Sequence, residues 1–140
     1  MVSIPFNRSL TSCNVVIKKF IILLFLPAFL SFQTPSLERK VMRKHDNGKE
    51  HVVLYFEKES GYLVKEEVYF PNGKHHWVGN YKKNIENGNW MYYYESGNIK
   101  TSENYLNGKE HGITTQYSES GKKIKEEFWK HGKMTKEIKH

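Results

Sequence analysis

An aromatic residue recurs at every twelfth position through the second half of this 140-residue chain. The series consists of Tyr69, Tyr81, Tyr93, Tyr105, Tyr117 and Trp129. Every second member is followed four positions later by a glycine, so the complete repeating unit consists of two of these twelve-residue halves. A half-unit of this length accommodates a strand of about eight residues and a turn of about four. The spacing therefore predicts a series of antiparallel strands built from repeated hairpins.

The segments between the aromatic positions carry the residues that tight turns require. Asn107–Gly108 and Asn72–Gly73 supply the positive backbone angles of a two-residue hairpin turn. Ser-Gly pairs at 96–97 and 120–121 suit a slightly longer loop that ends in glycine. Residues 89–94 are typical of the strand-forming stretches between the turns, and no helical period appears after residue 50. We therefore predict an all-β fold, an antiparallel meander of stacked β-hairpins, preceded by a helical signal segment.

The two turn types together constrain where the side chains point. A two-residue turn and a three-residue loop within each unit would place Tyr93 and Tyr117 on opposite faces of the sheet. Equivalent residues of a repeating sheet share a face, so one extra residue per unit has to be absorbed. We predict that Gly88 and Gly112 form the bulges that absorb it. With those bulges, all six aromatic residues of the series would line one face, in two rows.

Residues 1–33 differ in composition from the rest of the chain. Two lysines precede an apolar run from Phe20 to Leu30, a length that suits a secretory signal peptide better than a membrane span. We predict a signal peptide over residues 1–33, a linker over 34–46 and the hairpin repeat domain over 47–140. The protein would then be exported to the periplasm, the outer envelope or the medium. The alternative is a protein anchored in the membrane by its N-terminal segment.

The residue types that carry catalysis or bind metals form no recognisable set. The single cysteine lies inside the expected signal peptide, so the mature chain would lack a thiol. His75 and His76 are adjacent in a predicted strand and point to opposite faces, which disfavours joint coordination of one ion. Glu66–Glu67 and Glu126–Glu127 each stand beside a lysine, which favours charge pairing across strands of a solvated face over a catalytic carboxylate pair. We predict no catalytic residue, no metal site, no cofactor and no enzymatic activity.

The charge of the chain argues weakly for anionic partners. The chain has 22 basic and 15 acidic residues, and three of the basic residues precede residue 34. The remaining net charge of +4 is spread among the acids, so it does not predict a nucleic-acid groove. Lysines are frequent after residue 121, but glutamates alternate with them, and the case for a membrane surface is weak. These lysines are better explained as residues that keep the end of a sheet from aggregating.

The repeated motifs resemble those of a known family. The sequence NGKEH occurs at residues 47–51 and 107–111, and the sequence ESG ends at Gly61, Gly97 and Gly121. Units that combine these motifs with regularly spaced aromatics resemble the MORN-repeat variant of bacterial proteins, which includes YwqK-type antitoxin-like repeat proteins. The resemblance covers roughly residues 47–133. It implies a sheet of stacked hairpins with glycines in the turns, it implies no catalytic residues, and it implies an interaction role.

Aromatic residues outside the twelve-residue series are the candidate binding residues. The regular series is expected to pack between strands, whereas the others are free to lie on the surface. The tentative binding residues are Trp77, Trp90, Tyr92 and Tyr94. We predict an exported, non-enzymatic module for protein–protein interaction. The alternative is a module that binds carbohydrate or a cell-envelope polymer through these aromatics, and a third possibility is a small enzyme that acts on glycans or lipids.

Overall fold

The structure is a computed structural model that describes residues 35–140, so the predicted signal segment lies outside the described residues. The described part contains eleven strands and no helix, which confirms the all-β fold. The strands are β1 (Leu37–Lys44), β2 (Glu50–Glu57), β3 (Leu63–Tyr69), β4 (His75–Lys82), β5 (Ile85–Glu86), β6 (Gly88–Tyr93), β7 (Ile99–Leu106), β8 (Lys109–Glu110), β9 (Gly112–Tyr117), β10 (Lys123–Lys130) and β11 (Lys133–Lys139).

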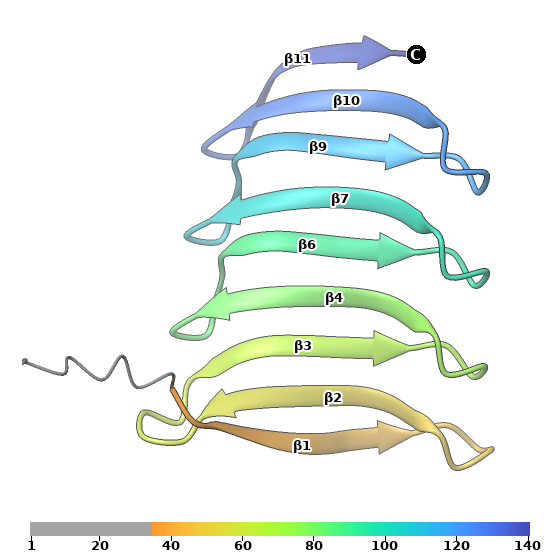
Figure 1. The fold of residues 1–140 in the computed structure, drawn as a ribbon. Coiled ribbons are helices and arrows are strands. Elements are labelled where there is room, and N and C mark those ends of the chain that lie inside the picture. The colour runs from red at the N-terminus through yellow and green to blue at the C-terminus, as the bar shows by residue number, and fades with distance from the viewer. Residues whose placement is uncertain (1–34) are drawn as a thin grey trace, which may run out of the picture. The chain divides into compact units, whose positions relative to one another are not determined.

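The strands form one antiparallel sheet in which each strand lies beside the next (Figure 1). Its order is β1-β2-β3-β4-β6-β7-β9-β10-β11, and the two-residue strands β5 and β8 pair with β4 and β7. This confirms the predicted meander of stacked hairpins. Within the described residues the sheet is a single layer, so side chains on both of its faces must find their packing partners among their neighbours on the same face.

The sheet begins earlier than the sequence suggested. Strand β1 lies inside the segment 34–46 that we predicted to be a linker, and it pairs with β2 through contacts such as Val41 opposite Val53. All eight of its side chains are exposed. A strand at the edge of a sheet can be rich in charged residues because only its partner strand covers it. The missing alternation of apolar and polar residues concealed β1 in the sequence.

The twelve-residue aromatics occupy both faces of the sheet, not one. The hydroxyl of Tyr81 donates to Glu66 (2.9 Å), whereas the hydroxyl of Tyr69 donates to Glu67 (2.6 Å). Adjacent residues of a strand point to opposite faces, so these two tyrosines lie on opposite sides. We call the face that carries Tyr81 the indole face, because Trp90 contacts Tyr81 on it. The opposite face carries Tyr69.

The pairing register explains why each step of the aromatic series changes the face. In the β6–β7 pair, Tyr105 lies opposite Gly88, which is five positions before Tyr93 along β6. Two residues separated by an odd number of positions along a strand point to opposite faces, and the same relation recurs in the other central pairs. Members of the aromatic series that are 24 residues apart therefore lie on the same face. The members on the indole face are Tyr81, Tyr105 and Trp129, and those on the opposite face are Tyr69, Tyr93 and Tyr117.

The extra residue that sets this register does not lie at Gly88 or Gly112, as we predicted. It lies at the start of the strand that follows each three-residue loop. There one residue has no partner opposite it in the preceding strand, namely His76, Lys100 or Ile124. Each of these residues is the third after a glycine with positive φ. At Gly88 and Gly112 the register slides by two positions, between β5 and β6 and between β8 and β9, and an even slide leaves the faces unchanged.

The turns also divide differently from the prediction. Asn107 and Gly108 both have positive φ (52° and 75°), as a two-residue turn of this type requires. Asn72–Gly73 instead belongs to a three-residue loop closed by the Phe70 N–H donating to the Lys74 carbonyl (2.8 Å), and only its glycine has positive φ. The second residue of the Asn-Gly pair therefore has the same role in both turns, whereas the asparagine does not.

Neighbouring turns are hydrogen-bonded to each other on both sides of the sheet where the strands end. On one side the Gly108 N–H donates to the Glu86 carbonyl (2.9 Å), and the Gly132 N–H donates to the Glu110 carbonyl (2.8 Å). On the other side the Asn72 side-chain amide donates to the Glu95 carbonyl (3.0 Å). The bonds on the first side recur once per repeating unit. They compensate for a small core, because the buried apolar residues of the described part are Val53, Val68 and Trp90.

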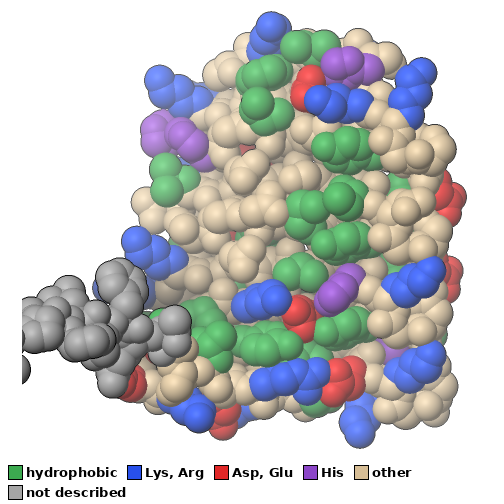
Figure 2. Space-filling model, viewed as in Figure 1, with side chains coloured by type: hydrophobic (Ala, Val, Ile, Leu, Met, Phe, Trp, Pro, Cys, Tyr) green, Lys and Arg blue, Asp and Glu red, His purple; other side chains and the backbone are tan. Residues whose placement is uncertain are grey.

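Side chains of one kind gather in stripes across the strands. Figure 2 shows one face of the sheet, where hydrophobic side chains form a column that runs across successive strands near the turns on the right. Polar side chains and backbone fill the middle of the same view. Such stripes follow from the repeat, because equivalent positions of successive strands lie next to each other across the sheet.

Candidate functional site

Trp90 belongs to the core and not to the surface, which corrects our prediction. Its side chain is 6% exposed, and its ring centroid lies 5.3 Å from that of Trp77 and 5.5 Å from that of Tyr105. Its indole N–H donates to the Asn80 carbonyl (3.0 Å). A buried indole that is packed and hydrogen-bonded in this way stabilises the sheet and presents little surface to a ligand.

Gly79 makes room for this indole. A Cβ atom at Gly79 would lie 2.8 Å from the ring of Trp90, which is closer than van der Waals contact allows. Gly79 does not have positive φ, so its backbone conformation does not require glycine. The sequence did contain a signal for this packing, since a glycine in the middle of a strand often marks a close approach of another group.

The other three candidates are partly exposed on the indole face. Trp77 and Tyr92 are neighbours there, with ring centroids 6.4 Å apart. Tyr94 lies two positions beyond Tyr92, and its hydroxyl donates to the Tyr117 carbonyl (2.8 Å). The ammonium group of Lys100 lies 5.7 Å from the centre of the Tyr94 ring. The prediction of surface aromatics therefore applies to Trp77, Tyr92 and Tyr94 alone.

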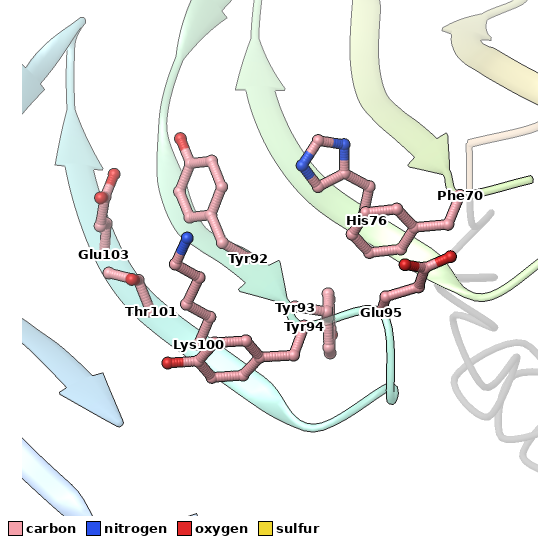
Figure 3. A pocket seen from close by; sticks show the side chains of 9 residues that line it. All are labelled: Phe70, His76, Tyr92, Tyr93, Tyr94, Glu95, Lys100, Thr101 and Glu103. Carbon is pink, nitrogen blue, oxygen red and sulfur yellow. The ribbon is translucent and has the colours of Figure 1, made fainter. Parts of the chain in front are cut away.

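Two of these residues line a common pocket of about 400 Å³ (Figure 3). It lies at the ends of β3 and β6 and the beginnings of β4 and β7, where Tyr92 and Tyr94 face it. Trp77 and Trp90 are not among its lining residues. The lining consists of Phe70, His76, Tyr92, Tyr93, Tyr94, Glu95, Lys100, Thr101 and Glu103. Aromatic rings, a hydroxyl, an ammonium group and carboxylates thus meet in one place, which is the composition of many binding sites.

Glu103 is the central polar group of the indole face, and sequence reasoning missed it. It lies opposite Trp90 in the sheet and accepts a hydrogen bond from the Tyr105 hydroxyl (3.1 Å). Burial raises the pKa of its carboxyl group, and the negative charges of Glu127 and Glu86 act in the same direction. Burial, together with the charge of Glu103, raises the pKa of Tyr92 to about 12. The repeat held the only signal, since Glu103 and Glu127 occupy equivalent positions of successive units.

Glu110 extends this acidic region toward the next strands. It pairs with Tyr105 across the β7–β8 hairpin and therefore shares its face. Burial raises the pKa of its carboxyl group, and the nearby charges of Glu103 and Glu127 raise it further. Both carboxylates thus lie in surroundings that disfavour their charged form.

The carboxylate at the centre of the opposite face, that of Glu67, has different surroundings. Glu67 is 7% exposed and accepts hydrogen bonds from the hydroxyls of Tyr55 (2.7 Å) and Tyr69 (2.6 Å) and from the Lys65 ammonium group (2.6 Å). Burial tends to raise its pKa, but these three bonds outweigh burial and lower the pKa to about 2. Glu67 is therefore ionised and satisfied within the chain.

The predicted lysine–glutamate pairing is present in a different arrangement. Lys65 pairs with Glu67, and Lys125 pairs with Glu127 (2.5 Å), in each case between next-but-one neighbours of a single strand. Lys125 also approaches Glu137 of the neighbouring strand (3.7 Å). The carboxylate of Glu67 in this pair is buried beside the hydroxyls of Tyr55 and Tyr69, whereas the side chain of Lys65 stays partly exposed.

The histidines stack on rings and on each other. The His75 ring lies 4.7 Å from Tyr69, and the His76 ring lies 4.3 Å from Phe70. The ring of His111, between β8 and β9, lies 4.9 Å from that of His131, in the turn between β10 and β11. Among residues 35–140 no three histidine, cysteine, aspartate or glutamate side chains are grouped so that they could hold a metal ion. The same residues include no helix that could cross a membrane.

These features define the chain as a single-layer antiparallel β protein made of hairpin repeats, with an aromatic and acidic indole face. No protein-family model, curated protein or solved structure matches it. The resemblance to the MORN-repeat variant therefore stays a prediction from the motifs and their spacing.

Proposed function

We propose that this protein is a non-enzymatic binding module that engages another protein through the indole face, in the cell envelope or outside the cell. The observation that carries the proposal is the set of partly exposed rings of Trp77, Tyr92 and Tyr94 on a sheet that has one layer within residues 35–140. The apolar segment near the N-terminus supports the exported location.

The physical argument rests on what such rings contribute at an interface. Aromatic side chains bury a large area at a small cost in conformational entropy, and tyrosine and tryptophan are enriched among residues that dominate binding energy. Strands β4 and β6 hold the rings of Trp77 and Tyr92, and the hydrogen bond to the Tyr117 carbonyl holds that of Tyr94. The buried indole of Trp90 stacks against Trp77. The face is thus ordered before a partner arrives, which lowers the entropic cost of association.

A photo-crosslinking experiment tests the proposal. A photoreactive phenylalanine analogue replaces Tyr94 in the full-length chain, and irradiation of cells that produce it is expected to give a covalent adduct with one partner protein. The matched control carries the analogue at Tyr62, which is 38% exposed in the loop before β3. Adducts of equal yield from both positions, or no adduct from position 94, would contradict the proposal.

A second candidate function is the binding of a carbohydrate or an envelope polymer. The pocket favours it, because Tyr92 and Tyr94 supply flat apolar rings while Thr101 and Glu103 supply hydrogen-bonding groups beside them. Binding to immobilised glycans that is lost in Tyr92→Ala, with an unchanged circular dichroism spectrum, would favour this function over protein binding. Phe128→Ala is the matched control, because Phe128 lies on the opposite face in β10.

A further inference from the structure

Four carboxylates at the centre of the indole face differ from Glu67 and Glu126 of the opposite face in having no lysine or arginine partner within residues 35–140. Seven glutamates lie on this face, namely Glu38, Glu66, Glu86, Glu103, Glu110, Glu127 and Glu137. Within residues 35–140 ion pairs are formed by Glu38 with Lys40 and by Glu127 and Glu137 with Lys125, toward the two ends of the sheet, whereas the four glutamates between them form none. Glu66 and Glu103 accept bonds from neutral tyrosine hydroxyls instead. The centre of the face therefore presents carboxylates that the described part of the chain does not pair with a cation.

The opposite face and the two end strands show how this fold satisfies such charges and rings with its own cations. Glu67 forms an ion pair with Lys65, and Glu126 forms one with Lys123, with 2.6 Å between the ammonium nitrogen and the carboxylate oxygen. In the end strands the ammonium group of Lys40 lies 5.2 Å from the centre of the Phe56 ring, and that of Lys136 lies 5.4 Å from the centre of the Phe128 ring. A cationic side chain laid over an aromatic ring is thus the regular arrangement at both ends of the sheet.

The centre of the indole face has the rings and the carboxylates of this arrangement, and the one lysine that lines its pocket, Lys100, lies over Tyr94. Trp77 lies beside Tyr92, and Tyr92 lies beside Glu103. Among the described residues no lysine or arginine lies over the rings of Trp77 and Tyr92. Lys125, further along the same face, is paired with Glu127.

We propose that the partner of the indole face is an extended protein segment that carries arginine or lysine side chains, which lie over Trp77 and Tyr92 and pair with Glu103 and Glu110. This inference rests on the proposed function and adds the chemistry of the partner. The arrival of cationic groups stabilises two carboxylates that burial and mutual repulsion now disfavour. A cation held between a ring and a carboxylate gains from both contacts, and the water excluded from a sheet face strengthens each of them.

The net charge of the protein makes the inference specific. The whole chain carries a formal charge of +7, so a cationic peptide is repelled by the molecule as a whole. Binding of such a peptide would therefore report a local acidic surface and not general electrostatic attraction. Long-range repulsion falls with added salt, whereas a short-range contact between a ring and a guanidinium group persists more strongly.

The test titrates the full-length chain with a peptide of alternating arginine and glycine, and with matched peptides that carry glutamine or glutamate in place of arginine. We expect binding of the arginine peptide alone, with backbone amide shifts in nuclear magnetic resonance spectra confined to residues of the indole face. Glu103→Gln/Glu110→Gln should weaken this binding about tenfold, as expected for the loss of roughly 1.4 kcal/mol. Glu119→Gln, in an exposed turn, is the matched control and should bind like the parent chain.

The inference is overturned if the arginine peptide does not bind, if the glutamine peptide binds equally well, if the shifts fall on the face of Glu67, or if the double variant binds like the parent. Should the double variant fail to fold, the single Glu110→Gln variant gives the same comparison, with a smaller loss expected. A partner captured at Tyr94 together with an inert arginine peptide would leave the proposed function standing and remove this inference alone.

Discussion

Two successive units of the sheet solve the same packing problem in different ways. In the first unit, Gly79 of β4 lies next to Trp90 of β6, whose indole covers it. In the second unit, the equivalent positions hold Glu103 in β7 and Thr114 in β9. Trp90 is 6% exposed and Thr114 is 4% exposed, so both units bury this position of the strand. The first unit thus places a large residue, Trp90, beside a glycine, and the second unit places a small residue, Thr114, beside a glutamate.

The comparison shows that the repeat specifies the backbone and leaves the side-chain pairing free. Both units have the same turns and the same pairing register, displaced along the chain by one unit. Each unit fills the space between the two strands at this position with a different pair of side chains, because close packing disfavours both a gap and an overlap there. The exchange also has a chemical result, since it brings a carboxylate to the middle of the indole face beside Tyr92.

The largest expected effect comes from removing the indole of the first unit. Trp90→Ala should lower the free energy of unfolding by about 3–5 kcal/mol, because it leaves Trp77, Tyr81 and Tyr105 without the ring they share. Urea unfolding followed by circular dichroism measures the change. Thr114→Ala is the matched variant of the second unit and should cost about 1 kcal/mol or less. Equal losses from both variants would show that the two units do not differ in how they pack.

The fold itself could be predicted from the sequence because its signals are local. The twelve-residue spacing reports strand length plus turn length, and Asn107–Gly108 is specific for one turn type. The residues that absorb the extra register position carry no such signal. His76, Lys100 and Ile124 have nothing in common except their distance from a glycine. The faces of the aromatic series depended on these three positions, and the prediction placed the irregularity at the more conspicuous glycines.

The candidate site could be predicted only in part, for a related reason. Exposure of an aromatic residue depends on its neighbour across the sheet, which periodicity along one strand does not reveal. Trp90 and Tyr92 look alike in sequence, but Trp90 lies beside Gly79 and is covered, whereas Tyr92 lies opposite Trp77 at the rim of the pocket. Glu103 could not be predicted because a glutamate in a strand suggests a solvated position. Its burial depends on Trp90, which the pairing register places opposite it, and on the hydroxyl of Tyr105.

A smaller effect is expected when the space above the glycine is filled. Gly79→Ala should cost about 1–3 kcal/mol, because its methyl group would meet the indole at 2.8 Å. In the Trp90→Ala background the same substitution should be neutral or stabilising, since the clash is gone and alanine restricts the unfolded chain. A double-mutant cycle of unfolding free energies measures this coupling. Additive effects of the two substitutions would mean that the glycine is not retained for the tryptophan.

The smallest effect is expected at Glu103, which occupies the position of the second unit that is equivalent to Gly79. The pKa of Glu103 is raised in the folded chain by burial and by neighbouring carboxylates. The folded state therefore holds this proton more tightly than the unfolded state does, and the resulting stabilisation is present at low pH and is lost as the pH rises through the raised pKa. Glu103→Gln should consequently be more stable than the parent chain at neutral pH, by less than about 1 kcal/mol, and should lose this advantage in acid.

The control for this last comparison is the carboxylate whose pKa shifts the other way. Glu67 on the opposite face has a lowered pKa of about 2, so its contribution to stability is present at neutral pH and is lost as the pH falls from the ordinary range of a glutamate toward that value. Glu67→Gln should destabilise the protein at neutral pH, and the difference from the parent should shrink in acid. Thermal unfolding across a pH series measures both variants. Parallel curves for the two substitutions would show that the faces do not hold their carboxylates in opposite ways, and the acidic character of the indole face would then lack its physical basis.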